Sequence, residues 1–431
     1  MYWLKRLHLN WVVAIAATLS GTSLVIVGLA QGGPQPDAPS IPGQPLTTAP
    51  TRQPDWSVAL ETYDDPLIHQ SQLLVARKEA KGQTTFLHAF DLATGKPQWK
   101  SSRPIASLYG AENNTIYASD FGVMSVVDDP KTLMTLDAKT GQVLSTMPIE
   151  DPDFFEVIGV SQGAFILNSY VKRGYESDRN KISARTATKV LWSFETPSYS
   201  QVSNRTGIVK NGVVMLPILI YGPASNRSYQ LTALDATTGK VLWRWNTKAE
   251  IETKVLDDTV YASVYSEDRA GLNQGWVKAF DLKSGQERWT HRMLGPYPAL
   301  ANEREVFILD NSAKSSTRFV VLDKQTGQSL REITLAPNEN PGGPVALRGN
   351  SIYKASMGST GSIVDVQNHS WVEVFDATTG QLQWRTPKLD HSHVNFWVAG
   401  DRLIVRRDAL GSEAKSEIQS YSLATLGQLA P

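Results

Sequence analysis

Six aspartates recur in one sequence context and are the first residues to consider for chemistry. Each is followed by Thr or Ser three residues later and by Gly four residues later. They are Asp91, Asp137, Asp235, Asp281, Asp323 and Asp376. Paired carboxylates serve general acid–base catalysis, but they do so in unlike environments, whereas these six stand in equivalent ones. A turn cap, in which each carboxylate accepts backbone N–H groups, accounts for all six.

Two other groups have the residue types of a metal site. The acidic run EDPDFFE at 150–156 contains four carboxylates, but their spacing matches no calcium-binding loop, and a solvated connection is the preferred interpretation. His391 and His393 are two residues apart, so both face one side of a strand. No third ligand is apparent in the sequence, which favours a polar pair at the start of a strand. We therefore predict no metal or cofactor site and no catalytic residue.

The elements that carry the six aspartates are predicted to be hairpins. Residues before each Asp alternate as in a packed strand, the Asp begins a type I turn, and the Gly supplies a left-handed conformation that closes it. The glycines are Gly95, Gly141, Gly239, Gly285, Gly327 and Gly380. A tryptophan follows in five copies, where it is expected to dock on the neighbouring repeat. These are Trp99, Trp192, Trp243, Trp289 and Trp384.

Two degraded copies complete the series. They are ISARTATKVLW, with Arg185 at the Asp position, and IQSYSLATLGQL, with Ser422 there, and the eight copies follow one another at 42–53 residues. This period, with about four short strands in each unit, is typical of a propeller blade. The predicted fold is all-β, a single eight-bladed β-propeller of four-stranded antiparallel blades. We expect Trp56–Leu60 to pair with the last blade, so that the ring has no open edge.

The repeat A-x-D-x-x-T-G-x-x-x-W resembles that of the pyrroloquinoline-quinone (PQQ)-like β-propeller superfamily from about Trp56 to Pro431. That superfamily contains quinone-dependent alcohol dehydrogenases and also non-enzymatic propellers, among them a lipoprotein of the outer-membrane β-barrel assembly machinery. The resemblance implies, for the dehydrogenases, a vicinal disulfide over the cofactor and an ion held by Glu, Asn and Asp. This chain has no cysteine, and no segment matches the ion ligands. The non-enzymatic branch, with no cofactor, is predicted.

The N-terminal part differs in composition from the repeats. Residues 1–10 are basic, residues 11–30 are uncharged and long enough for a bilayer core of about 30 Å, and residues 31–55 are rich in proline. They predict a cytoplasmic flank, a transmembrane or signal helix that is either retained or cleaved after Ala30, and a disordered linker before the propeller at 56–431. The propeller is expected outside the cytoplasm.

The balance of basic and acidic residues indicates which class of partner the protein binds. Lys plus Arg and Asp plus Glu number 42 each, which argues against nucleic acid. Loops between the second and third strands vary among units 2, 3, 5 and 7, and recognition is expected there. Arg173, Tyr175 and Arg179 of unit 3 form the candidate binding loop.

The predicted function is a monomeric, non-catalytic scaffold that binds another protein at the cell envelope and the membrane through its N-terminal helix. Two alternatives stay open: a PQQ-dependent oxidoreductase, and an extracytoplasmic sensor of small molecules or polysaccharide.

Overall fold

A computed structural model of the chain describes residues 49–60, 65–78, 84–121, 131–149, 155–171, 179–202, 207–222, 227–267, 273–294, 296–310, 317–335, 344–362, 365–390, 392–409 and 416–424. Chain contacts separate Met1–Thr47 from Thr48–Pro431, and the described residues belong to the second unit. The segments predicted at 1–10 and 11–30, and most of 31–55, lie outside the described residues. Among the residues that are described, no helix has the length and apolar character needed to span a bilayer.

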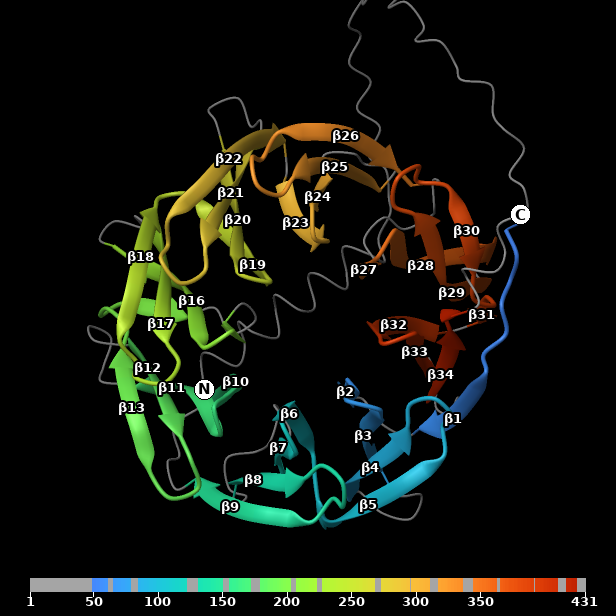
Figure 1. The fold of residues 1–431 in the computed structure, drawn as a ribbon, viewed down its shortest axis with the longest axis horizontal. Helices are drawn as coiled ribbons and strands as arrows, with labels where there is room; N and C mark the ends of the chain where they lie inside the picture. Colours follow the sequence, from blue (N-terminus) through green and yellow to red (C-terminus); the bar gives the residue numbers. More distant parts are fainter. Residues whose placement is uncertain are drawn as a thin grey trace, which may run out of the picture. The chain divides into compact units, whose positions relative to one another are not determined.

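The described residues form eight antiparallel sheets, which are the blades of a ring (Figure 1). Blade 1 contains β2 (Leu67–His69), β3 (Gln72–Lys78), β4 (Thr85–Asp91) and β5 (Pro97–Pro104). Blade 2 contains β6 (Ser107–Glu112), β7 (Thr115–Ser119), β8 (Lys131–Asp137) and β9 (Val143–Ile149). Blade 3 contains β10 (Phe155–Ser161), β11 (Ala164–Val171), β12 (Arg179–Arg185) and β13 (Val190–Glu195). Blade 4 contains β14 (Ser200–Val202), β15 (Ile208–Lys210), β16 (Val213–Tyr221), β17 (Arg227–Asp235) and β18 (Val241–Thr247).

The remaining four blades repeat this plan. Blade 5 contains β19 (Glu250–Leu256), β20 (Thr259–Glu267), β21 (Asn273–Asp281) and β22 (Glu287–Leu294). Blade 6 contains β23 (Pro296–Ala301), β24 (Glu305–Asp310), β25 (Arg318–Asp323) and β26 (Ser329–Thr334). Blade 7 contains β27 (Val345–Arg348), β28 (Ser351–Ser362), β29 (Asp365–Asp376), β30 (Leu382–Arg385) and β31 (Leu389–Asp390). Blade 8 contains β32 (Ser392–Ala399), β33 (Arg402–Ala409), β34 (Ser416–Ser422) and β1 (Trp56–Leu60). The predicted eight-bladed propeller of four-stranded antiparallel blades is confirmed.

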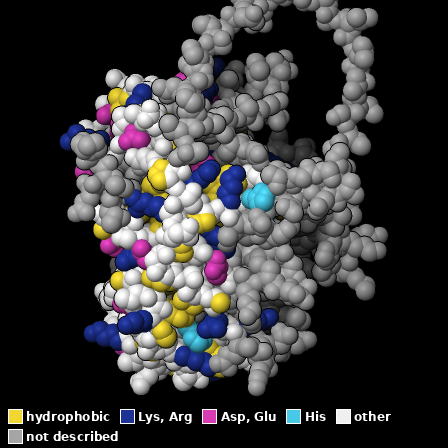
Figure 2. Space-filling view, turned by 90° about the vertical axis from the view of Figure 1, so that its right-hand side faces the viewer, with side chains coloured by type: hydrophobic (Ala, Val, Ile, Leu, Met, Phe, Trp, Pro, Cys, Tyr) yellow, Lys and Arg dark blue, Asp and Glu magenta, His cyan; other side chains and the backbone are white. Residues whose placement is uncertain are grey.

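Blade 8 is built from both ends of the propeller. Strand β1 pairs antiparallel with β34 from Trp56↔Ser420 to Leu60↔Ser416, which confirms the predicted closure. Pairing also begins before the predicted boundary at Trp56, because Thr51 bridges in parallel to Arg385 at the outer edge of β30. Figure 2 looks onto this side of the ring, where Lys and Arg side chains are seen more often than Asp and Glu. Ion pairing contributes here as well, since Arg402 binds Asp55.

The hydrophobic core lies between the blades. Strand residues alternate between the two faces of each sheet, so every blade presents one apolar face to each neighbour. The described residues form eight buried clusters, and each cluster joins two consecutive blades. For example, Met215 of blade 4 and Ala262 of blade 5 belong to the same cluster. A single blade buries neither of its faces alone, so we expect the blades to be stable only as a closed ring.

The two ends of the strands give the ring two faces. The Asp-containing turns join the third and fourth strands of each blade, and we name this the motif face. The connections between second and third strands lie at the other ends of the strands, on what we name the loop face. One of the predicted loops is mostly strand: in unit 7, β28 continues to Ser362 and β29 begins at Asp365. Backbone pairing there extends the hairpin and replaces the expected long loop.

Candidate functional site

The six repeat aspartates act within their own turns. In each turn Oδ1 accepts the backbone N–H of the Thr or Ser three residues later at 2.8–2.9 Å, and also its hydroxyl at 2.7–3.0 Å. The following glycine has a φ of +68° to +72° and donates its N–H back to the Asp carbonyl oxygen. Hydrogen bonding from Thr94 lowers the pKa of Asp91. The six carboxylates thus act as caps of their own turns.

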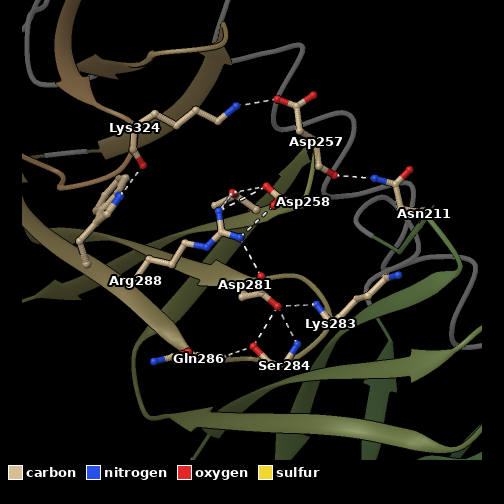
Figure 3. A network of polar contacts seen from close by, with 11 residues as sticks. Asn211, Asp257, Asp258, Asp281, Lys283, Ser284, Gln286, Arg288 and Lys324 are labelled. Atoms are coloured by element: carbon tan, nitrogen blue, oxygen red, sulfur yellow. Dashed lines mark hydrogen bonds and ion pairs between the residues drawn. The ribbon is translucent and has the colours of Figure 1, made fainter.

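Blade 5 adds a cation to its turn, as Figure 3 shows. Arg288 donates to Asp281 Oδ2 at 2.7 Å and to Asp258 Oδ2 at 3.1 Å, which joins the two turns of this blade on the motif face. The backbone N–H of Ser284 and the Arg288 guanidinium lower the pKa of Asp281 to about 2. Each carboxylate is occupied by an internal donor. This cluster therefore stabilises the two turns by an ion-pair bridge.

The same network connects three consecutive blades on the motif face. Asp257 carries the link: its Oδ2 accepts Lys324 Nζ of blade 6 at 2.6 Å, and its carbonyl oxygen accepts Asn211 Nδ2 of blade 4 at 2.8 Å (Figure 3). Asp257 has a φ of +53°, a left-handed conformation that is uncommon for residues other than glycine. Side-chain hydrogen bonds thus link blades 4, 5 and 6 on the motif face.

Tryptophan rings dock each blade on the repeat glycine of the next one. A Cβ atom added to the glycine would lie 2.4–2.6 Å from a ring atom, so the position admits no side chain without displacement. The pairs are Trp56 with Gly95, Trp99 with Gly141, Trp192 with Gly239, Trp243 with Gly285, and Trp289 with Gly327. In four of them the indole Nε1 also donates to the carbonyl oxygen one residue after the repeat Asp, at 2.9–3.1 Å.

Blades 6 and 7 depart from this arrangement. Blade 6 has Arg331 where the Trp stands elsewhere, and its Nη2 donates to Ala377 O at 3.2 Å, the carbonyl that the indole would bind. Trp384 of blade 7 is buried, but among the described residues its Nε1 finds no acceptor. The sequence of blade 8 has Ser422 at the position of the repeat Asp. Trp56 was not among the predicted docking residues; it precedes the first repeat motif, so alignment on Asp does not reveal it.

The described part of the loop face carries an aromatic and basic surface on blades 3 and 4. Of the predicted binding loop, Arg173 and Tyr175 lie outside the described residues. Arg179 starts β12, where its Nη1 donates to Glu195 Oε2 at 2.7 Å. Farther along, Tyr199 and Tyr221 expose 43% and 42% of their surface, so both rings are accessible to a partner.

The backbone and neighbouring side chains hold this surface in place. Tyr199 has a φ of +56°, and its carbonyl oxygen accepts the N–H of Tyr221 at 2.8 Å. The Tyr221 hydroxyl donates to Gln201 Oε1 at 3.2 Å, and the Arg227 guanidinium carbon lies 5.9 Å from the centre of the Tyr221 ring. A left-handed backbone at a tyrosine is costly and marks positions that function commonly maintains.

The remaining predicted groups yield no metal site in the described structure. Glu156 is the described member of the acidic run; it lies on β10, and burial raises its pKa to about 7. His393 is exposed on β32, and His391 lies outside the described residues. Within the ranges that are described, no three His, Asp or Glu side chains are grouped so as to hold a metal ion.

The sequence model of the family described as outer membrane protein assembly factor BamB matches residues 178–425, which begin in blade 3 and run to blade 8. The chain belongs to this family. The match also places it in the PQQ-like β-propeller superfamily that its repeats resemble. No curated protein sequence matches the chain.

Solved structures with a similar course of the chain include two dehydrogenases and one protein without a stated function. Quinohemoprotein alcohol dehydrogenase from Comamonas testosteroni is 11% identical, with 86% of this chain and 76% of that chain covered and a TM-score of 0.45. A europium-containing methanol dehydrogenase is 12% identical, with 86% and 93% covered and a TM-score of 0.49. The uncharacterized protein lmo1340 from Listeria monocytogenes EGD-e is 10% identical, with 74% and 93% covered and a TM-score of 0.42.

Proposed function

We propose that this propeller is a non-catalytic scaffold that binds another protein in the cell envelope through the loop face of blades 3 and 4. The observation that carries the proposal is the match to the family of the outer membrane protein assembly factor BamB over residues 178–425. The matched residues include the exposed surface around Tyr199 and Tyr221. The predicted N-terminal helix at 11–30 supports a place at the membrane.

The use of the carboxylates supports a non-catalytic role. An acid or base must reach a substrate proton, which requires an oxygen that is free to approach it. The repeat aspartates direct Oδ1 into their own turns, and Asp281 directs Oδ2 to Arg288 as well. The pKa values of Asp281 and Asp323 are also lowered, which makes these two carboxylates weak bases at neutral pH.

The chemistry of the blade 3 and 4 surface suits a protein partner. Tyr and Arg supply a large part of the binding energy at protein interfaces, because each combines apolar area with directed polar groups. Tyr221 and Arg227 stand at the end of the β16–β17 hairpin, and Tyr199 directly precedes β14, which pairs with β16. The Gln201 and Tyr221 side chains are already oriented by their hydrogen bond, which lowers the entropy lost on binding.

A comparison of variants in the full-length protein tests this proposal. We expect the tagged wild-type protein to retain one envelope protein, identified by mass spectrometry. The double variant Tyr221→Ala with Arg227→Ala should retain at least tenfold less. Leu144→Ala with Arg103→Ala, exposed positions of blades 1 and 2, provides the matched control and should retain the partner fully. Equal retention by both double variants would move the binding surface elsewhere.

The enzymatic alternative has its own measurement. The purified protein, supplied with PQQ and calcium, should show no dye-linked oxidation of alcohols or sugars. Turnover under these conditions, lost on removal of the quinone, would overturn the non-catalytic assignment.

A further inference from the structure

A β-bulge interrupts the outer strand of blades 1 to 7, directly after the turn that joins the third and fourth strands. In blade 4, Ala233 pairs with Trp243 and Leu234 pairs with Val241, so Leu242 is the extra residue of the outer strand. The extra residue of a bulge is left out of the pairing, and its side chain is re-aimed. In all seven blades this side chain is exposed on the rim of the ring.

The bulge position accepts polar residues, so packing does not require an apolar side chain there. Gln98 accepts a hydrogen bond from Gln72 Nε2 at 2.6 Å, and Arg288 binds Asp281. In blade 7 the residue is Gln383. The other four blades nevertheless have leucine at this position: Leu144, Leu191, Leu242 and Leu330. A single exposed leucine is ordinary on a protein surface, whereas a group of exposed apolar side chains marks a contact site.

Blades 3 and 4 each add a second exposed apolar residue to the bulge leucine. Both blades have the sequence Lys-Val-Leu-Trp there, at 189–192 and 240–243. The corresponding Val143 of blade 2 is half-buried against the core between blades 1 and 2, and blade 6 has Ser329 instead. We name the exposed side chains of blades 3 and 4 the rim surface: Val190, Leu191, Val241 and Leu242, which expose 38–52% of their surface.

The two halves of the rim surface lie on adjacent outer strands, β13 and β18 (Figure 1). Trp192 of β13 donates its Nε1 to Ala236 O at 2.9 Å, which fixes β13 beside the turn that leads into β18. The Arg244 guanidinium of β18 lies 6.0 Å from the centre of the Phe194 ring of β13. The chain from β12 to β13 and from β17 to β18 is described without a break. The valine and leucine pairs therefore form one surface across the seam between blades 3 and 4.

The charges around the rim surface are mainly basic. In the turns and outer strands of blades 3 and 4, at 185–196 and 235–248, Lys and Arg number five, whereas Asp and Glu number two. Both acidic side chains already accept hydrogen bonds, Glu195 from Arg179 and Asp235 from the Thr238 turn. The lysine directly before each exposed valine is itself exposed; these are Lys189 and Lys240. The rim surface thus combines aliphatic side chains with a net positive charge.

We propose that the rim surface binds a bilayer that contains anionic phospholipid. The valine and leucine side chains enter the boundary between headgroups and acyl chains, and the lysine ammonium groups stay beside the phosphates at the ends of their aliphatic stems. The composition favours lipid over protein, because protein interfaces are enriched in Tyr, Trp and Arg and depleted in Lys.

The shape of the ring limits the contact to two blades. A flat bilayer that meets the rim at blades 3 and 4 lies farther from the outer strands of blades 2 and 6, whose bulge leucines are Leu144 and Leu330 (Figure 1). The rim surface lies at the motif-face end of blades 3 and 4. The loop face of the same blades therefore stays accessible to a protein, and the inference does not depend on the proposed function.

Fluorescence quenching by lipid tests the proposal in the full-length protein, which has no cysteine of its own. Ser193→Cys and Glu332→Cys, equivalent exposed positions of β13 and β26, each carry a nitrobenzoxadiazole label. The proteins are reconstituted with vesicles of phosphatidylcholine and phosphatidylglycerol that contain spin-labelled lipid. Comparing two positions on one ring cancels any attachment through the N-terminal segment. We expect about fivefold stronger quenching at position 193, and less in phosphatidylcholine alone, because anionic headgroups attract the basic residues.

Substitution of the two bulge leucines locates the contact. Leu191→Gln with Leu242→Gln introduces the residue that blades 1 and 7 have at this position, so we expect an unchanged thermal unfolding transition. In the protein labelled at position 193, this variant should lower the quenching to the level at position 332. Leu144→Gln with Leu330→Gln is the matched control and should leave the quenching unchanged.

Three results would overturn the proposal. The first is equal quenching at positions 193 and 332, or an equal effect of the two double variants. The second is a change at position 193 that needs no vesicles and increases with protein concentration, which would assign the surface to a contact between two copies. The third is shielding only in the presence of the protein retained through Tyr221 and Arg227, which would assign it to that interface. In each case the proposed function is still decided by its own measurement.

Discussion

The seam between blades 4 and 5 and the seam between blades 7 and 8 bury the same kind of ring in different polar surroundings. Trp243 packs on Gly285 and donates its Nε1 to Leu282 O at 2.9 Å. Trp384 is 1% exposed, but the sequence of blade 8 has Ser422 at the position of the repeat Asp, and the Nε1 finds no acceptor among the described residues. Arg52 lies over this ring, 4.9 Å from its centre. The difference shows that burial and hydrogen bonding are separable parts of the dock.

The seam between blades 2 and 3 shows how a ring closes where the repeat has degraded on both sides. Position 145 is Ser where the Trp would stand, and blade 3 lacks the repeat glycine. Tyr117 packs edge-on against Phe165 with ring centres 5.2 Å apart, and Glu112 accepts the backbone N–H groups of Gln162 and Gly163. Contacts outside the repeat motif replace the dock here.

Removing the closing strand is expected to have the largest effect. Deletion of Trp56–Leu60 takes away the outer strand of blade 8 and the ring that packs on Gly95. Both faces of the open seam would meet water, so we expect a loss of more than about 5 kcal/mol or no cooperative folding. Deletion of residues 31–45 is the control and should leave the unfolding transition unchanged. Similar transitions for the two deletions would show that closure contributes little.

Trp243→Ala is expected to cost about 4 kcal/mol, as for other buried aromatic side chains. The loss combines the apolar area of the ring with the hydrogen bond to Leu282 O. Equilibrium unfolding in urea measures it. A midpoint equal to that of the wild type would contradict docking between blades 4 and 5.

Gly285→Ala changes the glycine on which Trp243 packs and should lower the free energy of unfolding by about 3 kcal/mol. The residue has a φ of +69°, and a Cβ atom would lie 2.4 Å from Trp243. The left-handed conformation contributes about 1 kcal/mol and the overlap with the ring contributes the rest. Gly349→Ala is the matched control, because Gly349 has a φ of +54° but no atom within 4 Å of the added group. Equal losses of stability in the two variants would show that the left-handed backbone conformation alone accounts for the loss.

Substitution by phenylalanine separates the hydrogen bond from burial. Trp243→Phe loses area and the bond to Leu282 O, whereas Trp384→Phe loses a similar area and an indole N–H without an acceptor. We expect Trp243→Phe to be more destabilising by about 1 kcal/mol, the net value of one hydrogen bond. Thermal unfolding of both variants provides the comparison. The opposite order would mean that the two rings differ chiefly in packing.

Acidification is expected to have the smallest effect on the free energy of unfolding. The pKa of Asp281 is about 2 in the folded protein, below its ordinary value of 3.8, so its contribution is complete above about pH 4 and is lost as the pH falls toward 2. Because the carboxyl is partly exposed, we expect about 1 kcal/mol. Asp281→Asn should remove this part of the acid dependence in unfolding measured between pH 5 and 2. An unchanged acid dependence would show that the Arg288 tie does not stabilise the fold.

Much of the fold follows from local chemistry that recurs along the chain. Asp, Thr and Gly at fixed spacing specify a turn whose hydrogen bonds lie within five residues, so Asp91 and Gly95 predict it without reference to the rest of the protein. The recurrence of that turn then predicts the number of blades. The candidate site follows much less from the sequence. Tyr199 and Tyr221 belong to no motif, and their exposure depends on how blade 4 packs.

The repeat turns, the alternation of strand residues, the eight units and the joining of the two ends were determined by the sequence itself, because each depends on neighbours in the chain or on a periodic pattern. Tertiary structure alone decided that Pro50–Arg52 lies along blade 7 and that Arg331 takes the place of an indole. These features depend on which distant backbone groups are left without partners after the blades have packed. That information is distributed over the whole ring, and no single stretch of the sequence contains it.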